Sequence, residues 1–128
     1  MSEQKGLVFV SGTEGTLEVL VDKVAGFKGK QDVFVQVSTG YQTEKTTVRK
    51  NAENVATINE VLKVQLMGIE TEVRFEVFDW DRFSANDLLA SQICSIADIS
   101  STHSVEAAWI SLNNGVKLHV LIRFHPKE

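Results

Sequence analysis

Residues 116–124 read Val-Lys-Leu-His-Val-Leu-Ile-Arg-Phe, with an apolar side chain at every even position. Successive side chains of a β-strand point to opposite faces of the sheet, so this pattern indicates a strand that buries one face. The same alternation recurs in residues 17–21 and 73–77. Each of these three stretches therefore predicts a half-buried strand with one face on a core.

Weaker alternation extends the pattern over most of the chain. We expect further strands at about residues 33–39, 42–49, 58–67, 89–96 and 108–112, and we leave one at 7–10 open. Turn residues separate them, among them Gly26 to Gly29 and Asn113-Asn114-Gly115, because Gly and Asn tolerate positive φ. One helical turn is expected around residues 96–104, where Asp98 could cap it. Short strands with turns about every ten residues predict an all-β antiparallel sandwich.

Length and composition fit a single domain. The chain has 128 residues, of which 43% are hydrophobic and 23% charged, which is enough to build a core without metal or disulfide bonds. Neither a linker nor an internal repeat divides it, so we expect one domain over residues 1–128 with its core in about 16–125. Trp109 is expected in that core, and Cys94 in a buried strand.

Charge and hydropathy limit the class of protein. A net charge of −4 argues against nucleic acid as the main partner, because phosphate binding needs a basic field. No apolar run has the length of a signal peptide or of a transmembrane span. The single cysteine, Cys94, cannot form an internal disulfide, which suggests a reducing compartment. We therefore expect a cytoplasmic protein.

Three carboxylates follow one of the strong strands. Asp79 and Asp81 stand two residues apart at its end, and Asp87 comes just before the next expected strand. Carboxylates that share one loop repel each other unless a cation lies among them, and calcium accepts several oxygen ligands in flexible geometry. A calcium-binding helix-loop-helix is excluded, because Ser84 takes the place of its glycine and Ala90 that of its glutamate.

The same stretch resembles the third calcium-binding loop of C2 domains, which carries Asp-x-Asp and a third Asp six residues later. Three other stretches fall in the family's order: Gln31–Val37 is similar to its Ser-Asp-Pro-Tyr-Val strand, Thr57–Glu60 to its Trp-Asn-Glu strand, and Trp109, Leu112 and Gly115 to its C-terminal signature. The resemblance covers about residues 16–125. It implies an eight-stranded antiparallel Greek-key β-sandwich, with the type II topology favoured because Asp32 follows the first family-like strand.

The resemblance also implies roles for individual residues. The implied calcium ligands are Asp32, Asp79, Asp81 and Asp87, assisted by Ser84 and the backbone carbonyl of Trp80. The implied membrane-binding residues at the loop tips are Phe27, Lys28, Lys30, Arg82 and Phe83. Lys45, Arg49 and Lys50 match a basic patch that related domains use for phosphoinositides.

Each of these roles has a plainer alternative. Lys28 stands near the position of a further first-loop acid in the family, so calcium binding is expected to be weak, and the acids could form a salt-bridged rim without metal. Phe83 could fold back over the end of the sandwich, and Trp80 could pack on the base of the loop. The three basic residues could form an ordinary solvated strand face.

The sequence favours a binding module over an enzyme. His103, His119 and His125 are scattered, and no nucleophile with its base can be assembled from motifs, so neither catalysis nor a small-molecule substrate is expected. We expect peripheral docking on anionic phospholipid, with calcium bridging loop carboxylates to lipid phosphates where the ion binds. The alternative is a calcium-independent protein–protein interaction module, which Lys28 in place of an acid favours.

Overall fold

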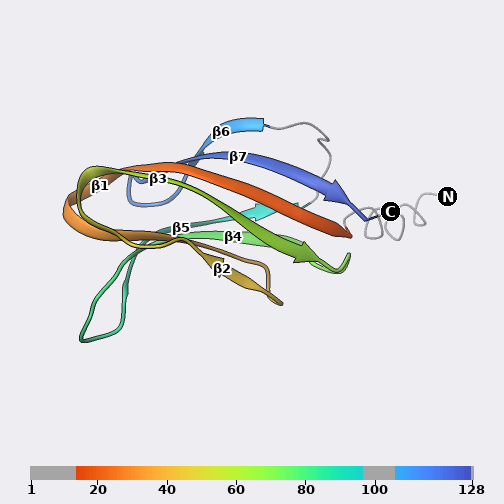
Figure 1. Ribbon diagram of the computed structural model, residues 1–128, viewed down its shortest axis with the longest axis horizontal. Helices are drawn as coiled ribbons and strands as arrows, with labels where there is room; N and C mark the ends of the chain where they lie inside the picture. The colour runs from red at the N-terminus through yellow and green to blue at the C-terminus, as the bar shows by residue number, and fades with distance from the viewer. Residues whose placement is uncertain (1–13, 97–105, 128) are drawn as a thin grey trace.

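The computed structural model describes residues 14–96 and 106–127 (Figure 1). The strand left open at 7–10 and the helical turn expected around Asp98 lie outside this part of the chain. Its strands are β1 (Gly15–Ser38), β2 (Thr43–Lys45), β3 (Arg49–Leu66), β4 (Glu72–Asp79), β5 (Asp87–Ser95), β6 (Glu106–Ser111) and β7 (Lys117–Pro126). All of their pairings are antiparallel, which confirms the expected fold class. Within the described residues, no helix has the length and apolarity needed to cross a bilayer.

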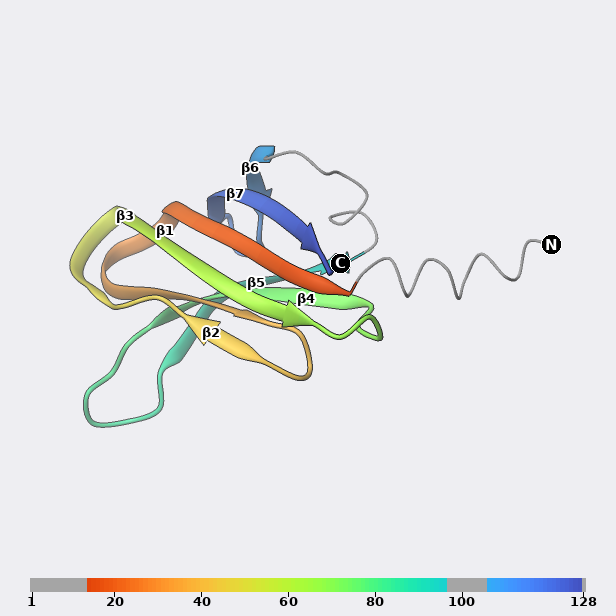
Figure 2. The same cartoon turned by 45° about the vertical axis from the view of Figure 1, so that its right-hand side comes forward.

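One long strand holds the two layers together. The strand order is β5-β4-β1-β7-β6, and β2 and β3 also pair with β1. Residues 15–25 of β1 pair with β3 and β7, whereas residues 33–38 pair with β4 and β2. Figures 1 and 2 show β1 curving between these two halves at the left of the molecule. The N-terminal half of β1 therefore belongs to one layer and the C-terminal half to the other.

Glycines at the corner allow β1 to bend instead of ending. Gly26 has φ 89° and Gly29 has φ 70°, and the register of β1 against β3 shifts between Ala25 and Lys30. A Cβ atom on Gly26 would lie 2.3 Å from the carbonyl oxygen of Gly115, so only glycine fits there. The sequence predicted a break between two strands at this point. The described residues instead form seven strands, of which β1 runs through the corner.

The core lies between the two layers and follows the predicted alternation. Its members from the three strongest stretches are all at most 3% exposed: Leu17, Val19, Val21, Val73, Phe75, Val77, Val116, Leu118, Val120 and Phe124. Burying one such side chain contributes about 1.5–3 kcal/mol. Cys94 on β5 is half-buried and packs against this core.

The prediction that Trp109 lies in the core is wrong. Its side chain is 49% exposed, and its ring leans on that of His119, with the ring centroids 4.9 Å apart. Trp109 pairs with His119 across β6 and β7, and His119 alternates with the buried Leu118 and Val120. Because paired residues share a face, Trp109 points away from the core.

Candidate functional site

The predicted acidic residues gather where β4 ends beside the corner of β1. A pocket of about 320 Å³ lies there, and its lining includes Asp32, Asp79 and Asp81. The start of β1 and the end of β7 pair with each other, and they lie at the opposite end of the sandwich from the loop at residues 80–86 (Figure 1).

Backbone hydrogen bonds fix the first two carboxylates. The Asp32 N–H donates to Asp79 Oδ1 at 2.8 Å, and the Trp80 N–H donates to the Asp32 carbonyl at 2.7 Å. The Asn51 N–H donates to Asp32 Oδ1 at 2.8 Å. Each of the two carboxylates therefore uses one oxygen to join neighbouring strands. Nothing in the sequence pattern pointed to Asn51, which lies within β3 with φ 56°.

The third carboxylate organises the loop itself. Asp81 Oδ1 accepts the Phe83 N–H at 2.9 Å, and the Asp81 N–H donates to Asn86 Oδ1 at 2.8 Å. The Phe83 N–H, followed by the Ser84 hydroxyl, lowers the pKa of Asp81 below its ordinary value. These hydrogen bonds close the loop locally, and the Phe83 side chain at its tip is 90% exposed. The alternative in which Phe83 folds back on the sandwich is wrong.

The acids do not converge on one point. Asp87 opens β5 opposite Asp79, is exposed, and does not line the acidic pocket. Within residues 14–96 and 106–127, no three His, Cys, Asp or Glu side chains come close enough together to hold a metal. Of the expected ligands, Asp32 and Asp79 therefore form a joined pair, Asp81 lies in the wall of the same pocket, and Asp87 lies outside it.

Of the three cations expected near the acids, Lys28 is the one that the structure places elsewhere. Lys30 and Arg82 line the acidic pocket. Lys28 lines a neighbouring hollow beside Leu89 and Val116, and its carbonyl accepts the Gln31 side-chain amide at 2.9 Å. The lysine in the wall of the acidic pocket is therefore Lys30 and not Lys28.

The prediction that Phe27 stands at a membrane-binding loop tip is also wrong. Its side chain is only 4% exposed and belongs to the core, so it does not stand at an exposed loop tip. The physical reason is the bend at Gly26, whose positive φ turns the next side chain inward over the end of the sandwich. Phe27 is therefore removed from the membrane-binding candidates.

The three residues of the expected basic patch have separate contacts. The Lys45 ammonium lies 5.8 Å from the Phe34 ring centroid, and the Lys50 ammonium 5.3 Å from that of the half-buried Trp80. Arg49 is 2.9 Å from Glu60 and also donates to the Ile58 carbonyl. Arg49 therefore braces β3, whereas the two lysines cover aromatic rings.

Hydrogen bonds from Thr47 and Arg49 keep Glu60 ionised, which supports the role of Arg49 as its partner within β3. Burial works to raise the pKa of Glu60, but the Thr47 hydroxyl and N–H and the Arg49 guanidinium together hold it below its ordinary value. Glu60 is therefore a stable anionic partner for Arg49 near neutral pH.

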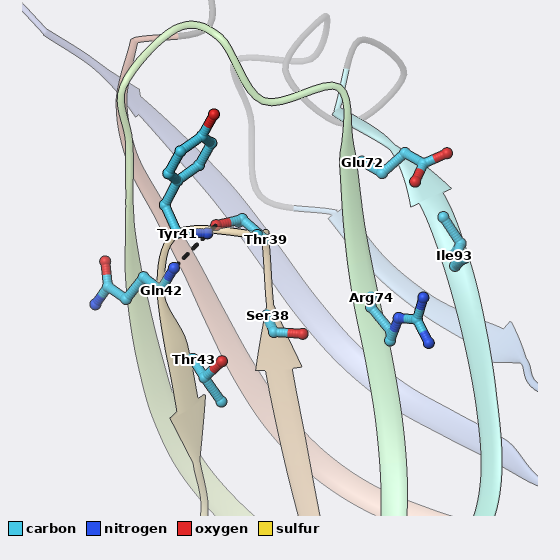
Figure 3. A pocket seen from close by; sticks show the side chains of 9 residues that line it. Ser38, Thr39, Tyr41, Gln42, Thr43, Glu72, Arg74 and Ile93 are labelled. Carbon is cyan, nitrogen blue, oxygen red and sulfur yellow. Dashed lines mark hydrogen bonds between the residues drawn. The ribbon is translucent and has the colours of Figure 1, made fainter.

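A further hollow of about 500 Å³ lies on the outer face of the other end, between the β1–β2 turn and strands β4 and β5. Figure 3 shows Arg74 on β4 next to Ile93 on β5, with Tyr41 projecting from the turn. The Thr39 hydroxyl accepts the N–H groups of Tyr41 and Gln42, which fixes that turn. Its lining mixes one guanidinium with the Glu72 carboxylate, and it is separate from the acidic pocket.

Comparison with known proteins identifies the fold family. A model of the C2 domain family matches residues 15–112. The chain belongs to the C2 domain family. No curated protein sequence matches it.

Several solved C2 domains have the same fold. The C2 domain A of plant extended synaptotagmin 1 superposes with a TM-score of 0.77 at 19% identity. The match covers 89% of this chain and 96% of that one. A C2 domain-containing protein from a putative elicitor-responsive gene gives 0.77 at 20% identity, covering 90% and 91%. The calcium-bound pair of C2 domains, A and B, of extended synaptotagmin 2 gives 0.77 at 20% identity, covering 88% of this chain and 46% of that one. At these identities the likeness establishes the fold alone.

Proposed function

We propose that this C2 domain is a peripheral, non-catalytic module that docks on anionic phospholipid of the cytoplasmic leaflet through the end that carries the 80–86 loop. The observation that carries the proposal is Phe83, 90% exposed at the tip of a loop held by its own hydrogen bonds. Arg82 lies beside it, with its guanidinium 5.7 Å from the Phe83 ring centroid. An aromatic ring enters the membrane interface, while each nearby cation adds about 1 kcal/mol of attraction to anionic headgroups.

Calcium is proposed as a weak addition to this docking. Asp32, Asp79 and Asp81 supply the oxygen donors that calcium takes, and all three line one pocket. However, one oxygen of each already accepts a backbone N–H, and Lys30 and Arg82 share the pocket wall. Bound calcium would add positive charge at the membrane-facing end. Among the described residues these carboxylates form no preassembled cage, so calcium would bind with low affinity and would need the carboxylates to move closer together.

The test is sedimentation with phosphatidylcholine vesicles that contain or lack phosphatidylserine, in EDTA. Phe83→Ala is expected to weaken binding to the anionic vesicles roughly tenfold, from the lost burial of one aromatic side chain. Met67→Ala is the matched control, because Met67 is 60% exposed on the turn at the other end of β4. Equal binding by the wild type and Phe83→Ala would overturn the proposal.

A second arm of the same assay tests the calcium contribution. Asp79→Asn with Asp81→Asn should remove any increase in sedimentation that calcium produces over EDTA, while the binding seen in EDTA remains. If all sedimentation requires calcium and disappears in this variant, docking runs through the carboxylates and not through Phe83 and Arg82.

A further inference from the structure

A second surface lies on the outer face of strands β3, β1 and β7, away from both the core and the loop end. Leu20 of β1 pairs directly with Val61 of β3 on one side and with Leu121 of β7 on the other. All three point away from the buried Val19 and Val21, and they line a shallow hollow of about 190 Å³. We call Val61, Leu20 and Leu121 the outer stripe. It is a continuous apolar row that no described element covers.

Trp109 extends the outer stripe onto β6. Ala107 pairs with Leu121, so Trp109, two residues further along β6, lies on the same face and diagonal to Leu121. The indole is 49% exposed, yet it is held between the His119 ring at 4.9 Å and the Lys23 ammonium at 5.9 Å from its centroid. An exposed aromatic side chain in a fixed position is the type of anchor that dominates protein–protein interfaces.

The charges around the outer stripe are mostly positive. Two carboxylates lie beside the outer stripe, and each pairs with a histidine: Glu18 lies 2.7 Å from His125, and Asp22 lies 2.7 Å from His119. The His125 hydrogen bond, with smaller contributions from nearby Lys63 and Arg123, lowers the pKa of Glu18, so this residue is ionised near neutral pH. Four cations share the face: Lys23, Lys63, Lys117 and Arg123.

None of these four cations has a carboxylate within 4.0 Å in the part of the chain that the structure describes. The chain as a whole has a net charge of −4, so this face differs in sign from the rest of the molecule. Lys63 and Arg123 flank the stripe on one side, and Lys23 and Lys117 lie beyond Asp22 on the other. The row is therefore apolar in the middle and cationic on both borders.

We propose that this face binds a protein segment that carries apolar side chains and is rich in acidic residues. The apolar side chains would cover the outer stripe and Trp109, and the carboxylates would pair with the cations on both borders. A second copy of this chain is the poorer occupant, because two faces with an excess of positive charge would meet. The surface is a face of the sandwich and the 80–86 loop is at its end, so this binding is independent of the docking proposed above.

The test uses fluorescent synthetic peptides of about ten residues, which at roughly 3.3 Å per residue are long enough to cross four strands. One peptide alternates Glu with Leu, a second alternates Lys with Leu, and a third alternates Glu with Gly. Fluorescence anisotropy is expected to give at least roughly tenfold tighter binding for the Glu-Leu peptide than for either of the others. Amide shifts in a nitrogen-15 spectrum should then fall on β1, β3 and β7 and on the Trp109 indole.

Three variants separate this face from other surfaces. Trp109→Ala is expected to weaken binding of the Glu-Leu peptide at least roughly fivefold, because it removes an interface anchor. The double variant Lys63→Glu with Arg123→Glu should also weaken binding of the Glu-Leu peptide, and the loss of affinity should be larger at low salt than at high salt. Phe83→Ala, at the loop end, should leave peptide binding unchanged. All of these residues are exposed, and melting temperatures verify that each variant folds.

Two results would overturn the proposal. The first is equal binding of the Glu-Leu and Lys-Leu peptides, and the second is unchanged peptide affinity in Trp109→Ala. If this variant also loses binding to phosphatidylserine vesicles, the face binds a membrane and not a protein segment.

Discussion

The turns at the two ends of β4 both use a carboxylate to hold backbone N–H groups, but in opposite surroundings. Before β4, Glu70 is 8% exposed, and its oxygens accept the N–H groups of Met67, Gly68 and Ile69 at 2.9–3.2 Å. After β4, Asp81 accepts the Phe83 N–H at 2.9 Å and stays exposed to solvent.

The difference between these turns separates a structural carboxylate from one that can meet a ligand. The oxygens of Glu70 are enclosed and shared among three donors, so this side chain has little capacity for a cation. The Asp81 side chain is exposed to solvent, and its turn projects an aromatic ring. Accessible acceptor capacity, and not the number of acidic residues in a turn, therefore indicates where ligand chemistry can occur.

The largest expected effect follows from removing the enclosed carboxylate. Glu70→Ala leaves the N–H groups of Met67, Gly68 and Ile69 without their acceptor, so unfolding free energy should fall by about 2–3 kcal/mol and the melting temperature by roughly 10 °C. Asp81→Ala is the control and should lower the melting temperature far less. Calorimetric unfolding measures both. Equal losses would show that the two turns do not differ in the way described.

Calcium binding gives the next largest effect. With a dissociation constant of about 1 mM, 10 mM calcium should stabilise the protein by about 1.4 kcal/mol. Lys30→Gln should tighten binding roughly threefold to tenfold because it removes a cation from the pocket wall, whereas Lys28→Gln should have no effect. Calorimetric titration of the two variants compares them directly. A larger effect from Lys28→Gln would restore the arrangement that the sequence suggested.

The smallest effect concerns protonation of Asp81. Its pKa lies below the ordinary 3.8 in the folded protein. The stabilisation from its ionised form is therefore fully present above about pH 3.8 and is lost as the pH falls through the lower folded value. In a carbon-13 titration the Asp81 carboxyl should have a midpoint below 3.8, and the Phe83 amide shift should follow it. A midpoint at or above 3.8 would mean that the loop hydrogen bonds do not form in solution.

Sequence alternation predicted the core because burial on one face imposes a period of two along a strand. It failed at the corner of β1, since positive φ at Gly26 and Gly29 breaks that period. Residue spacing alone therefore could not show that Phe27 turns inward or that Lys28 lies outside the acidic pocket. Trp109 was misplaced for another reason: large aromatic side chains favour the interior, whereas the register with His119 settles its face.

The candidate site was predictable in part. The spacing of Asp79 and Asp81 after a strand located the acidic end, and the exposed Phe83 lies in that loop. The bonds that occupy these carboxylates come from backbone N–H groups of Asp32, Asn51 and Phe83. Every residue except proline carries such a donor, so no pattern of side chains in the sequence predicts these contacts. Glu70 was overlooked for the same reason.

The continuity of β1 also affects how the protein forms on the ribosome. β1 is synthesised before the other described strands, but Leu17 pairs with Phe124 of β7, so the apolar face of β1 stays incomplete until more than a hundred further residues have been translated. Pairing between such distant segments is slow, and unpaired apolar strands are prone to aggregate. We expect the nascent chain to be a client of chaperones that hold extended apolar segments until β7 emerges.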